Sequence, residues 1–316
     1  MMHRTGRRGP PEPWVHRSVA DETYAVTLIT GVINTYQEAG NIRTAIASLR
    51  GWCDEIVVVD QHSTDGTREI AAAEGARVLL TEPTGFVEAA RQVGIDAAGG
   101  TWIVVLDADE LVHPELAREL RRIAEADALD VVRIPRKNIM LGRWMRYGMW
   151  WPNCKPRFFR KGSLVISDRI HMGLRPVAGA RILELPWREE MAIWHYSYHS
   201  LEDLVEKSNR YSSVEARQAG VKRNRKARPL PMLKAAAENL WDEYIKGRGY
   251  RDGTAALTVA VTRAYYRFLV LAKTWDEPGA GDRLAHHEAS KRRLLGLPPV
   301  GAPMAPAEEA KPEERA

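Results

Sequence analysis

Two aspartates separated by one residue, Asp107 and Asp109, follow the apolar run "WIVVL". A buried strand that ends on paired carboxylates offers oxygen ligands to a hard cation such as Mg²⁺ or Mn²⁺. In many enzymes such a cation bridges to the phosphates of a substrate. The alternative is a charged loop in front of the helix that Pro114 begins. The D-x-D spacing by itself is compatible with both interpretations.

The segments around this pair alternate between strand and helix. Apolar runs predict strands at residues 25–33, 55–60, 76–80, 102–106 and 131–135. Helical spacing fills the intervals, with one clear apolar face at residues 42–49. This alternation predicts right-handed βαβ units and a parallel sheet, which binds ligands at the carboxyl ends of its strands. Asp60 and Asp107 end the second and fourth strands, so we expect both at one edge of the sheet.

The composition is that of a soluble globular protein, with 316 residues, 45% hydrophobic and 28% charged. The net charge of +5 is mild and predicts no nucleic-acid partner. Cys53 and Cys154 have no metal-binding spacing, which favours a reduced, cytosolic location. The basic N-terminus has no apolar segment, so we expect no signal peptide. The apolar stretch Thr254–Ala272 contains Arg263 and Arg267, which argues against a membrane span.

The chain divides into four predicted units. A disordered, Pro-rich extension (1–22) precedes an α/β domain (23–199), a helical unit (200–276) and a disordered tail (277–316). A hairpin is expected around Lys161 and Gly162. Ser200 and Asp203 have the spacing of a capping box at the start of the helical unit.

Three motifs occur together in the α/β domain: "NTYQEAGN" after the first strand, "VVVDQHSTDGT" at the second and "VLDADE" at the fourth. As a set they resemble glycosyltransferase family 2, whose members have the nucleotide-sugar-binding GT-A fold. "GFVEAARQVGI", "PRFFRKG" and "IWHYSYHSLEDLVEKSNRYS" are similar to the bacterial lipopolysaccharide-core β-glucosyltransferase branch. The similarity covers residues 26–275. It implies a mostly parallel sheet flanked by helices, with a C-terminal helical extension near the acceptor or a membrane.

The resemblance also implies a nucleotide-sugar pocket, formed by Thr35, Tyr36, Glu38, Asp60, Arg91 and Asp107. Asp60 would accept a hydrogen bond from the imide N–H of the base. Arg91 matches the family's Arg-Asn pair, although Gln92 replaces the asparagine. It either neutralises phosphate or pairs with Glu88 on its own helix. Asp65 precedes a helix and is expected to be a structural cap.

The metal site implied by the resemblance has Asp109 as a ligand of Mg²⁺ or Mn²⁺. Asp107 would contact the ribose or the metal, and His195 would approach from the closing side. A cation there stabilises the negative charge that grows on the leaving diphosphate. Because family 2 members are inverting, we expect one general base and no covalent intermediate.

Two candidates for the base lie in "ISDRIHMG": Asp168 and His171. A positioned base typically contributes about 10²- to 10⁴-fold to the rate. The related enzymes have a glutamate where this chain has Met172. Either Asp168 takes over its role, or His171 acts alone.

Other classes of protein fit these residues less well. An aspartyl phosphatase carries its D-x-D on the first strand, and a nucleotidyltransferase has a Gly-rich loop there, which "GVINTYQEAGN" lacks. A sugar-binding scaffold with a dead site stays open as an alternative, as does a transferase acting on a soluble small acceptor. The preferred prediction is a metal-dependent inverting hexosyltransferase. Its donor would be a nucleotide diphosphate sugar, uridine diphosphate being the favoured carrier, and its acceptor a cell-envelope glycolipid or polysaccharide.

The helical unit carries features typical of a peripheral membrane protein. A basic run comprises Lys222, Arg223, Arg225, Lys226 and Arg228, and each charge can add about 1 kcal/mol against an anionic leaflet. Apolar and aromatic residues follow: Leu233, Leu240, Trp241, Tyr244, Ile245, Tyr265, Tyr266 and Phe268. Arg263 and Arg267 could reach lipid headgroups. We therefore expect a cytoplasmic protein on the inner face of the cell membrane.

Overall fold

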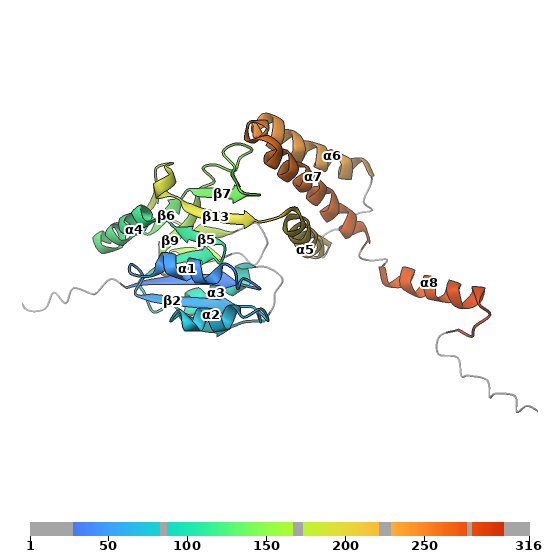
Figure 1. Ribbon diagram of the computed structural model, residues 1–316, viewed down its shortest axis with the longest axis horizontal. Coiled ribbons are helices and arrows are strands. Elements are labelled where there is room, and N and C mark those ends of the chain that lie inside the picture. The colour runs from blue at the N-terminus through green and yellow to red at the C-terminus, as the bar shows by residue number, and fades with distance from the viewer. Residues whose placement is uncertain (1–27, 83–86, 167–172, 221–228, 277–279, 300–316) are drawn as a thin grey trace, which may run out of the picture.

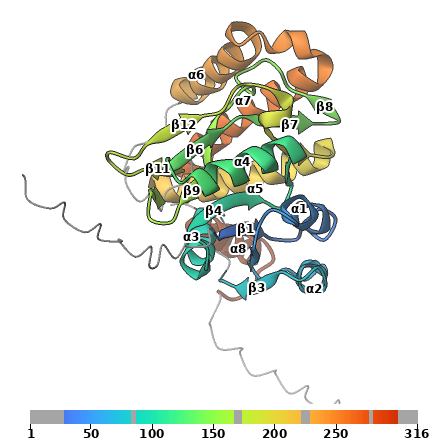
Figure 2. The same ribbon diagram turned by 90° about the vertical axis from the view of Figure 1, so that its left-hand side faces the viewer.

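A seven-stranded mixed sheet forms the centre of the protein. The computed structural model describes residues 28–82, 87–166, 173–220, 229–276 and 280–299. The strands lie in the order β12-β6-β9-β4-β1-β2-β3, seen in Figure 2 from β12 near the top to β3 near the bottom. Their bounds are β12 (Ile182–Glu184), β6 (Val131–Ile134), β9 (Lys155–Arg160), β4 (Trp102–Asp107), β1 (Ile29–Thr35), β2 (Glu55–Asp60) and β3 (Arg77–Leu80).

Strands β4, β1, β2 and β3 are mutually parallel, as the alternation of strand and helix predicts. In register, Asn34 lies opposite Asp107, and Thr35 lies opposite Asp60. The carboxyl ends of β1, β2 and β4 therefore meet at one edge. This confirms that Asp60 and Asp107 lie at the same edge of the sheet.

Strand β9 is inserted between β4 and β6, antiparallel to both. The hairpin expected around Lys161 and Gly162 is therefore wrong: the next strand, β10 (Leu164–Ile166), pairs instead with β11 (Leu174–Pro176). The reason is burial. Phe158 and Phe159 point to opposite faces of the sheet, and both are buried in separate core clusters. A strand that is apolar on both faces is stable only inside the sheet.

Helices cover both faces of this sheet. The cluster on one face includes the buried side of α1 (Ile42–Leu49) and α4 (Pro114–Ala126), together with Ala71 from α2 (Thr67–Ala73). The other face is covered by α3 (Val87–Ala97). A Cβ at Gly94 would lie 2.4 Å from Val32 Cγ1, so glycine allows α3 to approach the strands closely. Pro114 occupies the first turn of α4, as predicted.

A second, four-stranded sheet begins where β4 ends. Its order is β5-β13-β7-β8, with β5 (Glu110–Val112), β13 (Ile193–Tyr198), β7 (Arg136–Met140) and β8 (Arg143–Trp144). A short 3₁₀ turn, η1 (Glu189–Met191), precedes β13. Register places His195 opposite Glu110 on one side and Asn138 on the other. Residues 108 and 109 therefore connect a strand of the large sheet to a strand of the small one.

Three long helices form an extension at one end of the molecule, away from α1 and α2 (Figure 1). They are α5 (Leu201–Gly220), α6 (Pro229–Leu240) and α7 (Gly253–Asp276), and α7 packs against the other two. A π-helical turn, η2 (Trp241–Lys246), and a 3₁₀ turn, η3 (Gly249–Asp252), connect α6 to α7. Ser200 Oγ accepts a hydrogen bond from Asp203 N (3.1 Å), which confirms Ser200 as the helix cap.

One stretch of the described residues, Gly249–Trp275, is long and apolar enough to cross a membrane. A third of its most apolar window is buried inside the protein. Two of its arginines are paired: Arg263 with Glu243 (3.0 Å) and Arg267 with Glu215 (3.4 Å). These pairs fit a helix that packs on its neighbours.

The tail at 277–316 was expected to be wholly disordered, and this is wrong for residues 280–294. Helix α8 (Ala280–Leu294) occupies it, and Figure 1 shows this helix projecting beyond the rest of the protein. The physical reason is its content of strong helix formers, Ala, Leu, Arg and Lys, with three basic residues in the last turn where they favour the helix dipole. The predicted N-terminal extension, residues 1–22, lies outside the described residues. The boundaries of the four units stay predictions.

Candidate active site

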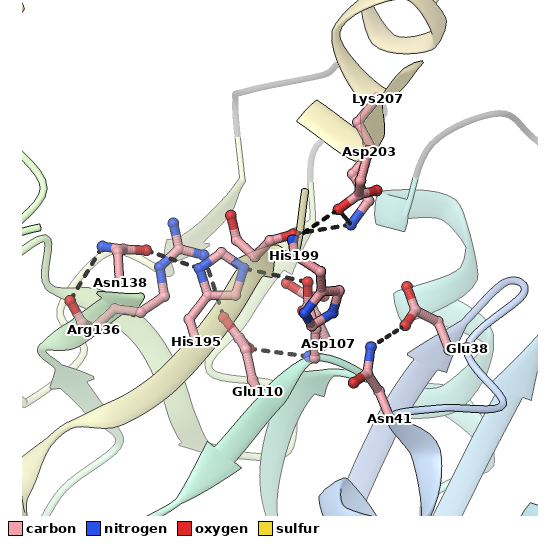
Figure 3. Close-up of polar contacts among 12 residues, drawn as sticks. Glu38, Asn41, Asp107, Glu110, Arg136, Asn138, His195, His199, Asp203 and Lys207 are labelled. Carbon is pink, nitrogen blue, oxygen red and sulfur yellow. Dashed lines mark hydrogen bonds and ion pairs between the residues drawn. The ribbon is translucent and has the colours of Figure 1, made fainter. Parts of the chain in front are cut away.

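The D-x-D motif is the turn between the two sheets. Asp107 is the last residue of β4, Glu110 is the first of β5, and Ala108 is buried between them. Asp107 N donates to Glu110 Oε2 (3.0 Å), which holds the turn closed. Figure 3 shows Asp107 and Glu110 side by side at this point, with His195 next to them.

Two arginines hold the Asp107 carboxylate. Arg91 from α3 donates to Oδ1 (2.5 Å), and Arg157 from β9 donates to Oδ2 (2.9 Å). Burial alone would raise the pKa of the Asp107 carboxyl, but the two guanidinium groups hold it well below its usual range. Asp107 is therefore ionised at neutral pH. Arg91 thus pairs with Asp107. Its suggested pairing with Glu88 stays a prediction, because the Glu88 side chain lies outside the described part of the structure.

Arg157 was not identified from the sequence as part of the site. Its side chain is only 7% exposed and also donates to Glu110 Oε1 (3.0 Å), which accepts from Arg136 as well (3.2 Å). Glu110 is fully buried. The two carboxylates and their arginines thus form one compensated cluster beneath the D-x-D turn. An arginine directly before two phenylalanines, in "PRFF", was the available signal for a buried cation.

Asp109 contacts the small sheet. Its backbone oxygen accepts from Tyr196 N (2.9 Å), and its Oδ2 lies 3.6 Å from His195 Nε2. Both side chains are mostly buried, with 14% and 13% exposed. The other ring nitrogen, His195 Nδ1, lies 2.8 Å from Asn138 Oδ1 (Figure 3).

The pair formed by Asp109 and His195 suits a divalent cation. A carboxylate oxygen is a preferred ligand of Mg²⁺ and Mn²⁺, and a neutral imidazole nitrogen is the commonest metal ligand in proteins. Two ligand atoms about 2.1 Å from a shared cation lie roughly 3 to 3.6 Å apart, which matches the observed separation. Among the described residues, no group of three or more His, Cys, Asp or Glu side chains comes together as a ligand set. The described residues thus offer two ligand atoms at this point, one from Asp109 and one from His195.

The loops after β1 and β2 are tied together at the same edge. Ser63 Oγ donates to Asp60 Oδ1 (2.5 Å), and Ser63 N donates to Oδ2 (2.8 Å). Ser63 Oγ in turn accepts from Gln37 N (2.8 Å). Asp60 is fully buried, so in this conformation its carboxylate organises the turn. Its contact with a nucleotide base stays a prediction.

Asp65 has the local partners of a structural cap. Its carboxylate accepts from Ala39 N (3.0 Å), and from the amide and hydroxyl of Thr67. Thr67 Oγ1 also accepts from Glu38 N (2.9 Å). The "STDGT" segment thus fixes the course of the loop that carries the predicted pocket residues.

Of the predicted pocket residues on β1 and its loop, Thr35 is buried, Tyr36 is 42% exposed and Glu38 is partly buried. Burial raises the pKa of the Glu38 carboxyl, the Asn41 hydrogen bond opposes this, and the negative charge of Asp109 adds to it. Glu38 therefore lies within electrostatic reach of the D-x-D motif. Thr35 Oγ1 is buried without a hydrogen-bond partner among the described residues.

Helix α5 lies across these loops, which the sequence did not predict. Arg210 sits 5.9 Å from the centre of the Tyr36 ring, and Lys207 is paired with Asp203 (3.3 Å). Figure 3 shows Asp203 and Lys207 above Asp107 and Glu38. The helical extension therefore contributes cations to the same edge of the sheet.

The two candidates for the general base, Asp168 and His171, lie outside the described residues, which omit 167–172. The strands on either side, β10 and β11, are paired with each other. The identity of the base stays a prediction.

Comparison with known proteins agrees with this geometry. Residues 31–174 match the family model described as glycosyl transferase family 2. An uncharacterised glycosyltransferase of Rickettsia prowazekii is 26% identical over 265 residues, covering 78% of this chain and 87% of the relative. The lipopolysaccharide core biosynthesis glycosyltransferase LpsC of Rhizobium meliloti is 27% identical over 255 residues, covering 74% and 89%. The succinoglycan biosynthesis protein ExoO of the same species is 30% identical over 169 residues, covering 49% of each chain.

A solved structure of glucosyl-3-phosphoglycerate synthase from Mycobacterium tuberculosis, in complex with Mn²⁺, uridine diphosphate and glucosyl-3-phosphoglycerate, is 25% identical. The likeness has a TM-score of 0.31 and spans 36% of this chain and 45% of that chain. It is too partial to assign a substrate. The family model and the relatives agree with the mixed, mostly parallel sheet flanked by helices: over residues 31–174 the chain matches glycosyl transferase family 2.

Proposed function

We propose that the protein transfers a sugar from a nucleotide diphosphate sugar to a hydroxyl of a cell-envelope glycan or glycolipid. The observation that carries this proposal is the pair of Asp109 and His195, 3.6 Å apart, beside the arginine-held Asp107 at the carboxyl edge of the sheet. The names of LpsC and ExoO, which concern lipopolysaccharide core and succinoglycan, support an envelope polysaccharide as the class of product. Uridine diphosphate is the preferred carrier, and a hexose is the preferred sugar.

Asp109 and His195 would hold Mg²⁺ or Mn²⁺, together with oxygens of the donor. When bound, the cation offsets the charge that develops on the leaving diphosphate. Asp107 is kept ionised and fixed by Arg91 and Arg157, so it suits the orientation of ribose hydroxyls at the metal's side. Thr35, Tyr36, Glu38 and Asp60 would line the base and ribose pocket.

The reaction is an in-line displacement. The acceptor hydroxyl oxygen forms a bond to the anomeric carbon while the bond from that carbon to the diphosphate oxygen breaks, with inversion. The hydroxyl proton passes to a base, either Asp168 or His171. Lys207 and Arg210 on α5 lie over the same edge and would exclude water from the donor.

The test is sugar transfer and nucleoside diphosphate release, measured over a panel of nucleotide sugars with and without EDTA. Asp109→Asn should lower turnover by at least 10²-fold, and Glu119→Gln, a carboxylate change on the outer face of α4, is the matched control. Full metal-dependent activity in Asp109→Asn would refute the assignment. A protein that binds donor but never turns it over would favour the scaffold alternative.

Peripheral attachment to an anionic membrane is the second part of the proposal. Leu257, Val261 and Tyr265 are spaced four residues apart on α7, and all are at least 41% exposed. At the junction of α6 and α7, Trp241 and Ile245 are exposed beside Lys246. Exposed aromatic and apolar side chains with adjacent cations are typical of interfacial helices.

Not every residue expected at the membrane is free to reach it. Tyr266 donates to Glu215 Oε2, Arg267 pairs with the same glutamate, and Arg263 pairs with Glu243. These side chains contribute to packing between helices. The basic run at 222–228 lies outside the described residues.

Flotation with anionic liposomes tests the attachment. The intact protein should float at low salt, and a variant with Lys222, Arg223, Arg225, Lys226 and Arg228 replaced by Gln should float less. An intact protein that stays in the soluble fraction would refute the membrane proposal and favour a soluble acceptor.

A further inference from the structure

Asn138 links the predicted metal ligand His195 to the rest of the protein. It lies on β7, is fully buried and is the register partner of His195 on β13. Its Oδ1 is 2.8 Å from His195 Nδ1. Its Nδ2 donates to the backbone oxygens of Trp150 (2.7 Å) and Arg136 (3.3 Å). Figure 3 shows the amide between Arg136 and the imidazole ring.

These contacts define which way the amide points. A backbone oxygen can only accept a hydrogen bond, so the two carbonyl groups require the NH₂ end of Asn138. The amide oxygen must then face His195, and an oxygen there requires a hydrogen on Nδ1. In a neutral imidazole only one nitrogen carries a proton, so Nε2 has a free lone pair.

That lone pair faces a carboxylate. His195 Nε2 and Asp109 Oδ2 are 3.6 Å apart, which is longer than a hydrogen bond between them would be. Two electron-pair donors that face each other in a mostly buried site repel unless a cation lies between them. The orientation of Asn138 therefore prepares His195 to act as a ligand.

We infer that Asn138 is a positioning residue, which fixes the tautomer of His195 and presents Nε2 to a divalent cation shared with Asp109. This inference rests on the proposed function. Orienting partners of this kind are known to affect metal sites, because they fix the ring and raise the basicity of the ligand.

The surroundings explain why the amide is held firmly. The Trp150 indole donates to Glu243 Oε1 (2.8 Å), and Glu243 is 4% exposed and also accepts from Arg263 (3.0 Å). The Trp150 carbonyl, one of the two that orient Asn138, thus belongs to a residue whose side chain is hydrogen-bonded to the helical extension. The extension and the candidate metal site are connected through one side-chain amide.

The first test measures Mn²⁺ binding, with and without uridine diphosphate. Binding is monitored through the electron paramagnetic resonance signal of the free ion. Asn138→Ala should weaken binding by about 10- to 100-fold. Asn138→Asp keeps an acceptor for Nδ1 but places its second oxygen against the two carbonyl groups, so it should restore only part of the affinity. The double variant Asn138→Ala/His195→Ala should bind no more weakly than His195→Ala alone, because Asn138 acts through His195. Thr30→Val, which removes a buried hydrogen bond to Glu55 at the other end of β1, should bind as the unmodified protein does.

The second test is direct: long-range ¹H–¹⁵N correlation should show the His195 ring protonated on Nδ1 and unprotonated on Nε2. A proton on Nε2 would overturn the inference, as would additive losses in the double variant. If Asp109→Asn and His195→Ala weaken Mn²⁺ binding but Asn138→Ala does not, only the positioning role falls. If neither ligand variant changes Mn²⁺ binding, the metal site of the proposed function fails and the inference falls with it.

Discussion

Replacing Arg157 with Met should lower the free energy of unfolding by about 3 kcal/mol at neutral pH. The Arg157 guanidinium is 7% exposed and pairs with Asp107 (2.9 Å) and Glu110 (3.0 Å). Removing one partner of a buried ion pair typically costs about 3–5 kcal/mol. Each carboxylate keeps one other arginine, Arg91 or Arg136, so the lower end of this range applies.

The loss of unfolding free energy caused by Arg157→Met should depend on pH. In the unmodified protein the arginines hold the pKa of Asp107 below its usual range against the opposing effect of burial. A carboxyl with a depressed folded-state pKa stabilises the protein above its unfolded pKa of about 4, and this stability is lost as pH falls toward the folded pKa. Without Arg157 the depression is smaller. The difference in unfolding free energy between the two proteins should therefore stay nearly constant from pH 7 to about 4 and narrow as pH falls further.

Urea denaturation at several pH values measures both effects. Arg160→Met is the matched control, since Arg160 lies on the same strand but is 32% exposed and pairs with Asp127 at the surface. Its loss should cost no more than about 1 kcal/mol. A loss for Arg157→Met below about 1 kcal/mol at pH 7, or one that does not become smaller as pH falls below 4, would show that the carboxylate cluster is not compensated in this way.

Three further outcomes are expected. Asp168→Asn and His171→Ala should differ in turnover: the variant that lacks the general base should lose turnover while its affinity for the donor stays nearly unchanged. Near-normal turnover in both variants would exclude both residues as the base. Gly94→Ala should destabilise the protein by about 1–3 kcal/mol in thermal unfolding, because its Cβ would lie 2.4 Å from Val32 Cγ1. Burial raises the pKa of the Cys154 thiol to about 11, so a thiol reagent at pH 8 should label it far more slowly than an unfolded control.

The parallel half of the sheet could be predicted because it depends on local patterns. Continuous apolar runs gave β2 and β4, and helical spacing gave α1 and the start of α4. The placement of β9 could not be predicted in the same way. Its position between β4 and β6 depends on pairing with strands about 25 and 55 residues earlier in the chain. The two phenylalanines in "PRFF" indicate that β9 is buried, but they do not identify the strands with which it pairs.

The candidate site was predictable to the same extent. Residues at the ends of predicted parallel strands, such as Asp60 and Asp107, were placed correctly at one edge because the topology brings them there. Arg157, Asn138 and Lys207 were missed, since each reaches the site from an element whose position depends on long-range packing. No local spacing relates a β9 arginine to a β4 aspartate.

The one-residue spacing of the D-x-D motif has a structural meaning that the sequence does not reveal. Asp107 ends a strand of the large sheet, and its carboxylate is neutralised by arginines from α3 and β9. Asp109 leads into the small sheet, and within the described part of the chain its carboxylate pairs with a histidine from β13 and with no guanidinium group. Adjacent residues in a strand point to opposite sides, but a turn between two sheets lets carboxylates two positions apart enter different environments. We therefore expect Asp109, rather than Asp107, to hold the cation, and exchanging the two roles would require moving Arg157 as well.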